Sequence, residues 1–579
     1  MISRSAFGFA LAATLFASTA CDRSGASTDA GGATSRDAQV EAPPIEFSGA
    51  PRRGFLPQDG AGDPGEGVTL PAQGVEAPPA VTDVAASIPD AGARPTAPSN
   101  AAVPEAALSA GVEAAVARAL SRARKASSDR VHGRNVVVSM VAVDAETGRV
   151  LVRRQSEVAL VPASNMKLLT VAAALVTLGA DGSFTTVFET DAPVVGGVLD
   201  GDLVVRAGGD PLHRREGDGS LGPWIEPLAE ALRAAGIQRV SGALILDEGA
   251  WLEPGPGPQW PSPAEYWNDH CALAGGFSAN AGCFRATITP TREGQRATVV
   301  LRPRHHGLTR KGSVTTTGSR LKVNVGANRG GVTVRGSIRA DASPYVTSFS
   351  HPDPVDLFGH VMIGGLADRG ILVDGGFVRA RGVELKNPRV IHTMRSAIAS
   401  VIPAILLDSD NSVADQLFFA AGAHAGGEGT REAGARAVRE ALESLGVEAR
   451  SLVQVDGSGL SKANRTSAEQ VAALVAAVIH KGGAVREAIV ESLPVAGRSG
   501  TLKRRMRGTV AEGRVRAKTG WVKGASALSG VVSTLEGREV VFSILVGYPL
   551  VDGLNTKAWK PMQDEICIAL TEWTPEGWQ

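Results

Sequence analysis

The stretch VPASNMKLLTVAAALVTLG, residues 161–179, most constrains what this chain can fold into. After Pro162 it is apolar at most positions, which predicts a helix packed inside a core. The first turn of that helix nevertheless carries Ser164 and, three residues later, Lys167. Residues three apart on a helix lie on one face, with their Cβ atoms about 5 to 6 Å apart. The helix is therefore expected to hold a hydroxyl beside an amine.

Such a pair suits nucleophilic catalysis. A serine attacks a carbonyl only when a base removes its proton, and a desolvated lysine near another cation can serve as that base. Backbone N–H groups at the helix N-terminus can stabilise a developing oxyanion. The SxxK spacing is weak by itself, because about two chance matches are expected in a chain of this length. SRLK at 319–322 is another match, in a strand-like stretch, and Ser164 with Lys167 also fits an ordinary helix start with a solvated lysine.

Two later motifs supply further polar groups. LLDSDNSVADQL places Ser409 and Asn411 at an expected helix start, where they would either cap the helix or offer a hydroxyl and an amide to the Ser164 site. AKTGWVKGASALSG places Lys518 on an expected strand, either as a second positive charge of the site or as an ordinary surface lysine. Gly520 on that strand removes a side chain where a substrate backbone can add to the strand edge.

The order of the expected elements divides the chain. A helix at 104–126 and a hairpin precede the Ser164 helix, whereas residues 191–389 show short strands between Gly and Pro turns and one helix near 224–235. Helices are then expected at 393–407, 411–422, 430–446 and 467–480, followed by strands and a final helix at about 555–570. The pattern predicts an α/β (α+β) fold, in which residues 105–190 and 390–579 build one helix-covered sheet and 191–389 form one or two inserted, mostly β domains.

The order SxxK, then SDN, then KTG decides the family, because each motif is common but the ordered set is not. It resembles the penicillin-binding proteins and serine β-lactamases. The long gap before SDN, together with VDGSGLSKANR (455–465), SLPVAGRSGTLKRRM (492–506) and GDLVVRAGGDP (201–211), narrows the resemblance. Over residues 110–579 the chain looks like the D-alanyl-D-alanine carboxypeptidase/endopeptidase family of low-molecular-mass penicillin-binding proteins.

The resemblance implies a serine β-lactamase/transpeptidase-like domain, a helix-covered antiparallel sheet, acting on peptidoglycan stem peptides through an acyl-enzyme. It implies that β-lactams are covalent inhibitors and that no metal or organic cofactor is needed. Carried onto this chain, Ser164 is the acylated nucleophile and Lys167 its base. Ser409 and Asn411 relay protons and hold the substrate amide, and Lys518 supports the site electrostatically.

The residues after Lys518 are expected to bind substrate. The resemblance implies that Thr519 helps bind the terminal carboxylate and that the backbone N–H groups of Ser164 and Trp521 meet the oxyanion. The family usually has a Ser or Thr hydroxyl at the position of Trp521. We expect the indole to weaken selection for a free carboxylate and to offer an apolar platform for a cross-linked peptide, unless it packs away and a neighbour such as Ser526 takes over.

Other functions compete with the peptidase. A serine β-lactamase would share the fold and the acylation step but would need fast deacylation; the inserted region and the DGSGLS segment favour the peptidase. A catalytically silent peptidoglycan-binding protein has no need for all four of the residues Ser164, Lys167, Asn411 and Lys518. A transpeptidase is disfavoured by the lack of an obvious second catalytic domain. The balanced charge, 59 Lys and Arg against 59 Asp and Glu, argues against nucleic-acid binding.

The N-terminus predicts export. Residues 1–20 have an early positive charge, an apolar run and then small residues, which is typical of a secretory signal peptide. Cys21 follows directly, as at a bacterial lipoprotein cleavage site, although Ser18 stands where such sites usually carry Leu. We expect lipidation of Cys21, a disordered tether over 21–104 that is rich in Ala, Pro and Gly, and an exported, periplasmic, membrane-tethered enzyme. Export permits disulfides, and Cys271 and Cys283 are expected either to pair or to be buried thiols.

Overall fold

A computed structural model describes residues 103–213, 221–318 and 321–574. The expected signal peptide, Cys21 and residues 22–102 of the tether lie outside these ranges, as does Ser319 of the second SxxK match. None of the helices in the described ranges is both long and apolar enough to span a membrane.

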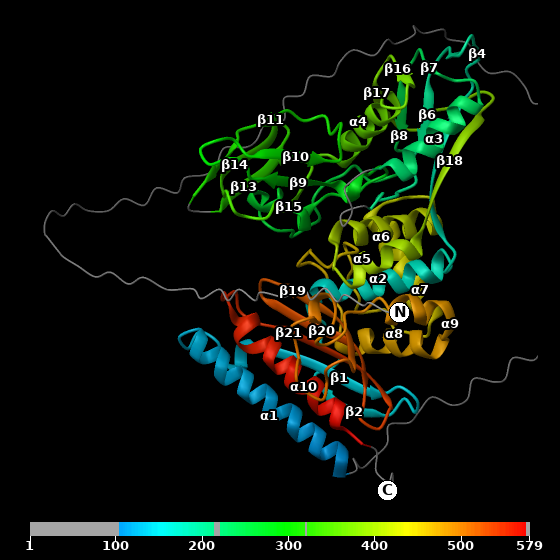
Figure 1. The fold of residues 1–579 in the computed structure, drawn as a ribbon. Helices are drawn as coiled ribbons and strands as arrows, with labels where there is room; N and C mark the ends of the chain where they lie inside the picture. The colour runs from blue at the N-terminus through cyan, green and yellow to red at the C-terminus, as the bar shows by residue number, and fades with distance from the viewer. Residues whose placement is uncertain (1–102, 214–220, 319–320, 575–579) are drawn as a thin grey trace, which may run out of the picture. The chain divides into compact units, whose positions relative to one another are not determined.

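A five-stranded antiparallel sheet joins the two ends of the described chain (Figure 1). Its order is β19-β20-β21-β1-β2. Strand β1 pairs with β21 along its whole length, with Val137 opposite Gly547 at one end and Asp144 opposite Val540 at the other. The strands are β1 (Val137–Asp144), β2 (Val150–Arg154), β19 (Val515–Val522), β20 (Ala525–Ser533) and β21 (Glu539–Gly547). The expected hairpin and the three expected late strands therefore form one sheet, with β19 at its edge.

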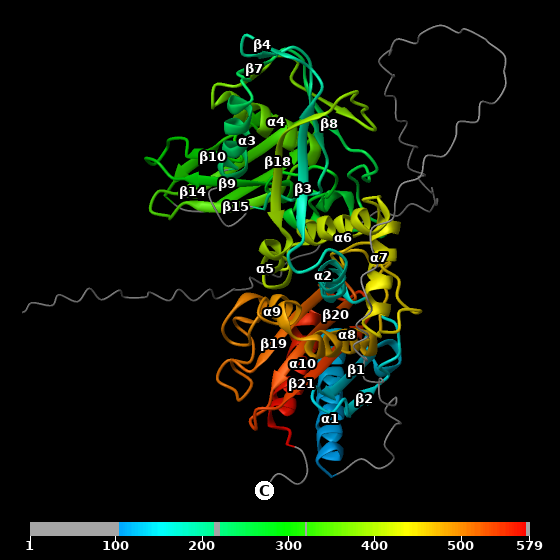
Figure 2. The same cartoon turned by 90° about the vertical axis from the view of Figure 1, so that its right-hand side faces the viewer.

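Both faces of this sheet are covered by helices. On one face lie α1 (Val103–Ala126) and α10 (Lys560–Glu572), which pack against side chains such as Met140 and Phe542. In α1 the buried residues recur every three or four positions, as in Leu108, Val112 and Val116, which is the pattern of an amphipathic helix. Figures 1 and 2 show α1 and α10 along that face and α2 and α8 along the other.

The second face carries the core that holds the site. Its central helix, α2 (Met166–Thr177), is buried on all sides from Met166 to Leu175 and follows a short 3₁₀ turn, η2 (Ala163–Asn165). A helix that is apolar all round needs neighbours on every side. These neighbours are α5 (Ile402–Leu406), α6 (Asn411–Gly426), α7 (Arg431–Ser444), α8 (Ala468–Lys481) and α9 (Gly483–Val490).

The inserted segment has a sheet of its own, with the order β17-β8-β6-β3-β18, and a smaller one, β16-β7-β5-β4. Two helices, α3 (Gly222–Ala234) and α4 (Pro354–Ala367), pack on a shared core with these strands. The strands are β3 (Ser183–Thr190), β4 (Val194–Val195), β5 (Val198–Leu199), β6 (Leu203–Arg206), β7 (Arg239–Val240), β8 (Leu244–Asp247), β16 (Leu372–Val373), β17 (Phe377–Ala380) and β18 (Arg389–Ala397).

A second part of the insert is all β. It consists of a three-stranded sheet, β10-β9-β15, and a sheet in which β14 pairs with β11, β12 and β13. The two sheets share a small core around Phe284, Val334 and Phe349. The strands are β9 (Cys283–Thr289), β10 (Thr298–Arg302), β11 (Arg310–Lys311), β12 (Val314–Thr317), β13 (Lys322–Asn328), β14 (Gly331–Arg339) and β15 (Tyr345–Ser350).

Two expectations about the insert are wrong. Helix α4 was not expected, and its sequence carries several glycines, which normally disfavour helix. In the fold these glycines allow close packing: a Cβ at Gly359 would lie 2.6 Å from the ring of Phe377, and one at Gly365 would lie 2.5 Å from Ile225. The Asp353 side chain caps the helix by accepting the N–H of Val355.

The second error concerns residues 393–407, expected as one helix. Their first part is the end of β18, which pairs along the whole of β3, and only Ile398–Leu406 is helical, as a 3₁₀ turn followed by α5. The β-branched residues before Met394 favour a strand once a partner is present. Because β3 and β18 both pair within the insert, we propose that the insert runs from Ser183 to Ala397 rather than over 191–389.

Candidate active site

The turn before α2 carries Ser164, the expected nucleophile, at the wall of a cleft. Ala163 adopts φ 47°, in the left-handed region, so the chain turns sharply into the 3₁₀ turn that carries Ser164. Ser164 is half-buried and lines a cleft, while Lys167 lies one turn later and is fully buried. A non-glycine residue in this backbone region costs free energy and persists only where its surroundings enforce it.

Lys167 reaches back to Ser164, as the sequence predicts. Its Nζ lies 3.1 Å from the Ser164 Oγ, 2.6 Å from the Asn411 Oδ1 and 2.6 Å from the carbonyl oxygen of Ser458. A charged ammonium has three N–H donors and would satisfy all three oxygens. A neutral amine donates to two of them and keeps a lone pair, so the same geometry accepts the hydroxyl proton of Ser164.

The surroundings of Lys167 favour the neutral form more than water does. Burial lowers its pKa to about 8, and the nearby carboxylates of Asp415, Asp456 and Asp410 limit the fall. Asp415 is itself buried, and burial together with the charge of Asp456 raises its pKa to about 7. The Asp415 Oδ1 accepts the backbone N–H of Ser458 at 2.8 Å, which fixes the carbonyl-bearing segment beside Lys167.

Asp410, rather than Ser409 or Asn411, caps helix α6. The Asp410 side chain accepts the N–H of Val413 at 3.2 Å, so the capping alternative for its two neighbours does not hold. Asn411 instead joins two parts of the site, accepting from Lys167 and donating its Nδ2 to the carbonyl oxygen of His270 at 2.8 Å. Ser409 has φ 67° and turns its hydroxyl toward the strand opposite.

Lys518 reaches the site from β19. It is fully buried, and its Nζ donates to the Ser409 Oγ at 2.8 Å and to the Thr519 carbonyl oxygen at 3.0 Å. Burial lowers the pKa of Lys518, and the charge of Lys167 lowers it further. The alternative of an exposed strand lysine is therefore wrong, and the three motifs meet as two hydrogen-bonded pairs, Ser164 with Lys167 and Ser409 with Lys518.

Gly520 has a packing reason to be small, in addition to the expected role at the strand edge, which stays a prediction. A Cβ at this position would lie 2.7 Å from the carbonyl oxygen of Pro162 and 3.0 Å from Ala527, so glycine lets β19 approach the nucleophile turn. Asn165, oriented to satisfy both ends of its amide, ties the same turn to the sheet. Its nitrogen donates to the Lys518 carbonyl oxygen at 2.9 Å.

Thr519 and Trp521 lie on the other side of β19 from Lys518. The Thr519 Oγ1 donates to the Thr501 Oγ1 at 2.8 Å. The Trp521 side chain is 58% exposed, lines the cleft and donates its Nε1 to the Tyr548 hydroxyl at 3.2 Å. Ser526 does not take over, because its buried hydroxyl faces away and donates to Asn555.

Comparisons with known proteins identify the family of the chain. Residues 124–570 match the model of the D-Ala-D-Ala carboxypeptidase 3 (S13) family. The chain belongs to this family. A D-alanyl-D-alanine carboxypeptidase of Actinomadura sp. (strain R39) is 36% identical to this S13 peptidase over 468 residues, which cover 76% of the chain and 83% of that relative.

Solved structures show the same fold. The crystal structure of penicillin-binding protein 4 from Haemophilus influenzae matches with a TM-score of 0.63 at 20% identity, covering 78% of this chain and 98% of that one. A crystal structure of the same protein complexed with a β-lactam matches with a TM-score of 0.60 at 20% identity, covering 79% and 99%. The family, the fold class and the class of enzyme expected from the sequence are confirmed.

The cleft of this S13 peptidase has a volume of about 590 Å³, and part of its wall comes from the insert. The sequence did not identify the residues of the insert that line this cleft. Trp260 lines the cleft and donates its Nε1 to the Asp456 Oδ2 at 3.2 Å, and His270 supplies the carbonyl that holds Asn411. A backbone carbonyl leaves no mark in the sequence, so only the fold reveals its part.

The DGSG segment supports the family resemblance, and in the structure it also contacts the site. Asp456 accepts the backbone N–H groups of Gly459 and Ser461, both at 2.7 Å, and so folds this loop tightly. Gly459 has φ 79°, and a Cβ there would lie 1.8 Å from the carbonyl oxygen of Ala163. The loop therefore packs its backbone directly on the nucleophile turn, which places the Ser458 carbonyl against Lys167.

The alternative of a Cys271–Cys283 disulfide is wrong, and the structure has two buried thiols instead. Cys271 ends a 3₁₀ turn, and burial raises the pKa of its thiol to about 12. Cys283 begins β9 and directs its Sγ to the carbonyl oxygen of Asp269 at 3.8 Å. The two cysteines are close in sequence, but closeness in sequence does not determine whether their side chains face each other. Within the described ranges no group of three or more His, Cys, Asp or Glu residues is placed to hold a metal ion.

Proposed function

We propose that this S13 peptidase is a serine-type D-Ala-D-Ala carboxypeptidase/endopeptidase that acts on peptidoglycan stem peptides. The observation that carries the proposal is the contact between the Lys167 Nζ and the Ser164 Oγ at 3.1 Å, inside a cleft that also receives Ser409 and Asn411. The family and the relative from Actinomadura support the substrate class.

Acylation follows from the two hydrogen-bonded pairs. Neutral Lys167 takes the hydroxyl proton of Ser164, whose Oγ forms a bond to the carbonyl carbon of the penultimate D-Ala. The C–N bond to the last residue then breaks. The leaving amine receives a proton through the Ser409 hydroxyl, which lies next to the Lys518 Nζ. The product is a serine ester, and the released group is D-Ala or, in a cross-link, the side-chain amine of a neighbouring stem peptide.

Substrate alignment is assigned to the edge of β19. The segment around Pro494 pairs with this edge through the Ala517 N–H, 3.0 Å from the Pro494 carbonyl oxygen. Beyond Ala517 the edge borders the cleft, where an extended peptide can add as a further strand. The backbone N–H groups of Ser164 and Trp521 hold the oxyanion, and the hydroxyl of Thr519 holds the terminal carboxylate.

The reaction ends when water attacks the ester carbon, the C–Oγ bond breaks and Ser164 regains its proton. A serine β-lactamase would share every step but would hydrolyse a penicilloyl ester quickly. Wild-type protein treated with a penicillin should therefore gain one penicilloyl group on Ser164 that survives isolation for mass spectrometry, and Ser164→Ala should gain none. Labelling of the Ser164→Ala variant, or on Ser319, would overturn the assignment, whereas rapid turnover of the penicillin would select the β-lactamase.

We also propose that the enzyme is exported and tethered by a lipid on Cys21. The supporting observation is the sequence order of positive charge, apolar run and small residues before this cysteine. Intact-mass measurement of protein extracted from membranes should show removal of residues 1–20 and the mass of a lipid on Cys21. A water-soluble mature form with an unmodified Cys21 would contradict the tether but not the peptidase.

A further inference from the structure

The chain as a whole has no net charge, but one part of it has a strong excess of basic over acidic residues. Between Cys283 and Ser350 the sequence has twelve Lys and Arg residues and two Asp and Glu residues. This range is the all-β part of the insert, strands β9 to β15. Among its exposed basic side chains in the described ranges, Arg304 forms an ion pair with Asp368 and Arg339 with Asp341. This part of the insert therefore has a net positive charge that can attract an anionic partner.

The exposed face of strands β13 and β14 carries part of this charge. Asn324 pairs with Arg335 across the two strands, and Gly326 pairs with Thr333. Because side chains alternate along a strand, these residues share one face, while Val323 and Val334 turn toward the core of the other face. The shared face offers amides, a hydroxyl and a guanidinium.

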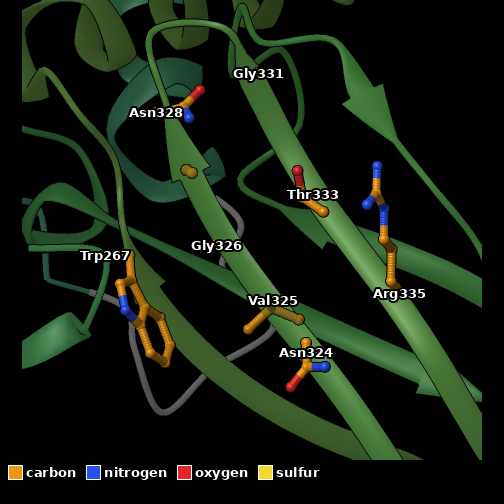
Figure 3. Close-up of a pocket in the computed structure, with 9 residues that line it drawn as sticks. Trp267, Asn324, Val325, Gly326, Asn328, Gly331, Thr333 and Arg335 are labelled. Atoms are coloured by element: carbon orange, nitrogen blue, oxygen red, sulfur yellow. The ribbon is translucent and has the colours of Figure 1, made fainter. Parts of the chain in front are cut away.

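Trp267 completes a groove of about 470 Å³ on this face. Its side chain is 43% exposed, and its backbone carbonyl accepts the N–H of Ser350 at 3.0 Å, which ties it to the end of β15. Figure 3 shows the indole on one side of β13 and Thr333 and Arg335 on the other. A flat apolar ring is thus held beside a row of hydrogen-bonding groups.

Gly326 forms the floor of the groove, and the fold does not require glycine there. Its φ is not positive, and a Cβ at this position would meet only the Trp267 Cβ, at 3.9 Å, an ordinary contact. By contrast Gly331, at the end of the hairpin, has φ 124° and no room for a side chain. The backbone conformation does not need glycine at position 326, but the absence of a side chain there keeps the groove open.

One loop serves both this groove and the catalytic cleft. Trp260 and the His270 carbonyl contribute to the catalytic cleft, and Trp267 of the same loop lines the groove. A polymer that reaches the cleft can therefore continue past this loop along the face of β13 and β14.

We propose that the groove binds the glycan strand of peptidoglycan, next to the stem peptide that enters the cleft. The proposal rests on the proposed function and adds a second contact with the same polymer. The apolar face of a pyranose ring packs on Trp267, because an indole presents a large rigid surface. N-acetyl groups pair with the amides of Asn324 and Asn328, which both donate and accept. Arg335 and its basic neighbours attract the carboxylates of uncross-linked stem peptides.

The test measures binding of soluble glycan strands that carry uncross-linked pentapeptide stems. Full-length protein with Ser164→Ala is used, so that the strands are bound but not cleaved. In that background Trp267→Ala, Gly326→Leu and Arg335→Gln each remove or fill part of the groove. Arg292→Gln is the matched control, because Arg292 is an exposed arginine of the same β part outside the groove. We expect the three groove variants to bind at least about tenfold more weakly and the control to change less than about twofold.

A second measurement separates this inference from the proposed function. With Ser164 intact, each groove variant should turn over a short soluble pentapeptide at the wild-type rate but show a raised KM for the strands. Absence of pentapeptide turnover in the wild type would overturn the proposed function. Normal pentapeptide turnover with unchanged strand binding in Trp267→Ala and Gly326→Leu would overturn the groove alone. Equal weakening in Arg292→Gln, or tighter binding to vesicles of anionic phospholipid than to strands, would also overturn it.

Discussion

The pKa of Lys167 predicts how acylation depends on pH. If neutral Lys167 removes the proton of Ser164, the acylation rate follows the fraction of Lys167 that is neutral. Burial lowers this pKa to about 8. The neutral fraction is then about 9% at pH 7 and about half at pH 8. The second-order rate constant for a fluorescent penicillin should rise about fivefold from pH 7 to 8 and level off above pH 9. Below pH 7 it should change less steeply than for an isolated lysine, because Asp415 takes up a proton there and no longer raises the pKa of Lys167.

Asp415→Asn tests the cause of this profile. The Asp415 carboxylate is the largest of the charges that raise the pKa of Lys167 against the effect of burial. Removing it lowers that pKa further, so the midpoint of the profile should move to lower pH. An asparagine still accepts the Ser458 N–H with its Oδ1, so the loop geometry is kept. Because about a tenth of Lys167 is already neutral at pH 7, the gain there is at most about tenfold.

The assay is stopped-flow acylation from pH 6 to 9.5, with Glu536→Gln as the control for loss of an exposed carboxylate far from the site. That control should superimpose on the wild type. A wild-type rate that does not change between pH 6 and 8 would refute Lys167 as the base. A midpoint that moves to higher pH in Asp415→Asn would refute the electrostatic argument even if the wild-type profile held.

Further measurements test other parts of the site. Lys167→Ala should slow acylation at least about a hundredfold, and a near-normal rate would mean that another group activates the serine. Gly459→Ala should lose most penicillin labelling and lower the melting temperature, since its Cβ overlaps the nucleophile turn; unchanged labelling would contradict that packing. Trp521→Thr should raise the ratio of pentapeptide to cross-linked dimer turnover, and an unchanged ratio would show that the indole does not set the preference. Cys271 and Cys283 should both react with iodoacetamide in denatured, unreduced protein, whereas protection of both would restore the disulfide.

The sequence predicts those features that depend on local pattern or on motif order. The apolar run after Ser164, the amphipathic α1 and the hairpin of β1 and β2 each show their own periodicity, so their positions were close to the observed ones. The order of the three motifs predicted that Ser164, Ser409 and Lys518 lie close together in the fold. Local sequence patterns alone could not predict this, because the three residues are far apart in the chain. The roles of these residues remain proposals.

What the sequence did not reveal depends on partners distant along the chain. Residues 393–397 are extended because β3 is there to pair with them. Helix α4 tolerates its glycines because rings such as Phe377 fill the space beside them. The carbonyl oxygen of Ser458 contacts Lys167 because the fold of the loop brings it there, and every residue type has such an oxygen. The basic character of the β part of the insert was masked by averaging over the whole chain.

The pairing of β1 with β21 also sets the order of events during synthesis. Val137 and Gly547 are adjacent in the sheet but about four hundred residues apart in the chain, so that closing this contact waits until nearly all of the polypeptide has been made. The segment from Ser183 to Ala397 has its own sheets and cores and can fold while the N-terminal strands still lack neighbours. Ser164 therefore emerges early without its partner strand, and the contact between Ser409 and Lys518 can form only as the last strands dock. Premature termination before Val515 would yield a chain that contains Ser164 and Lys167 but lacks Lys518 and three of the five strands of the sheet.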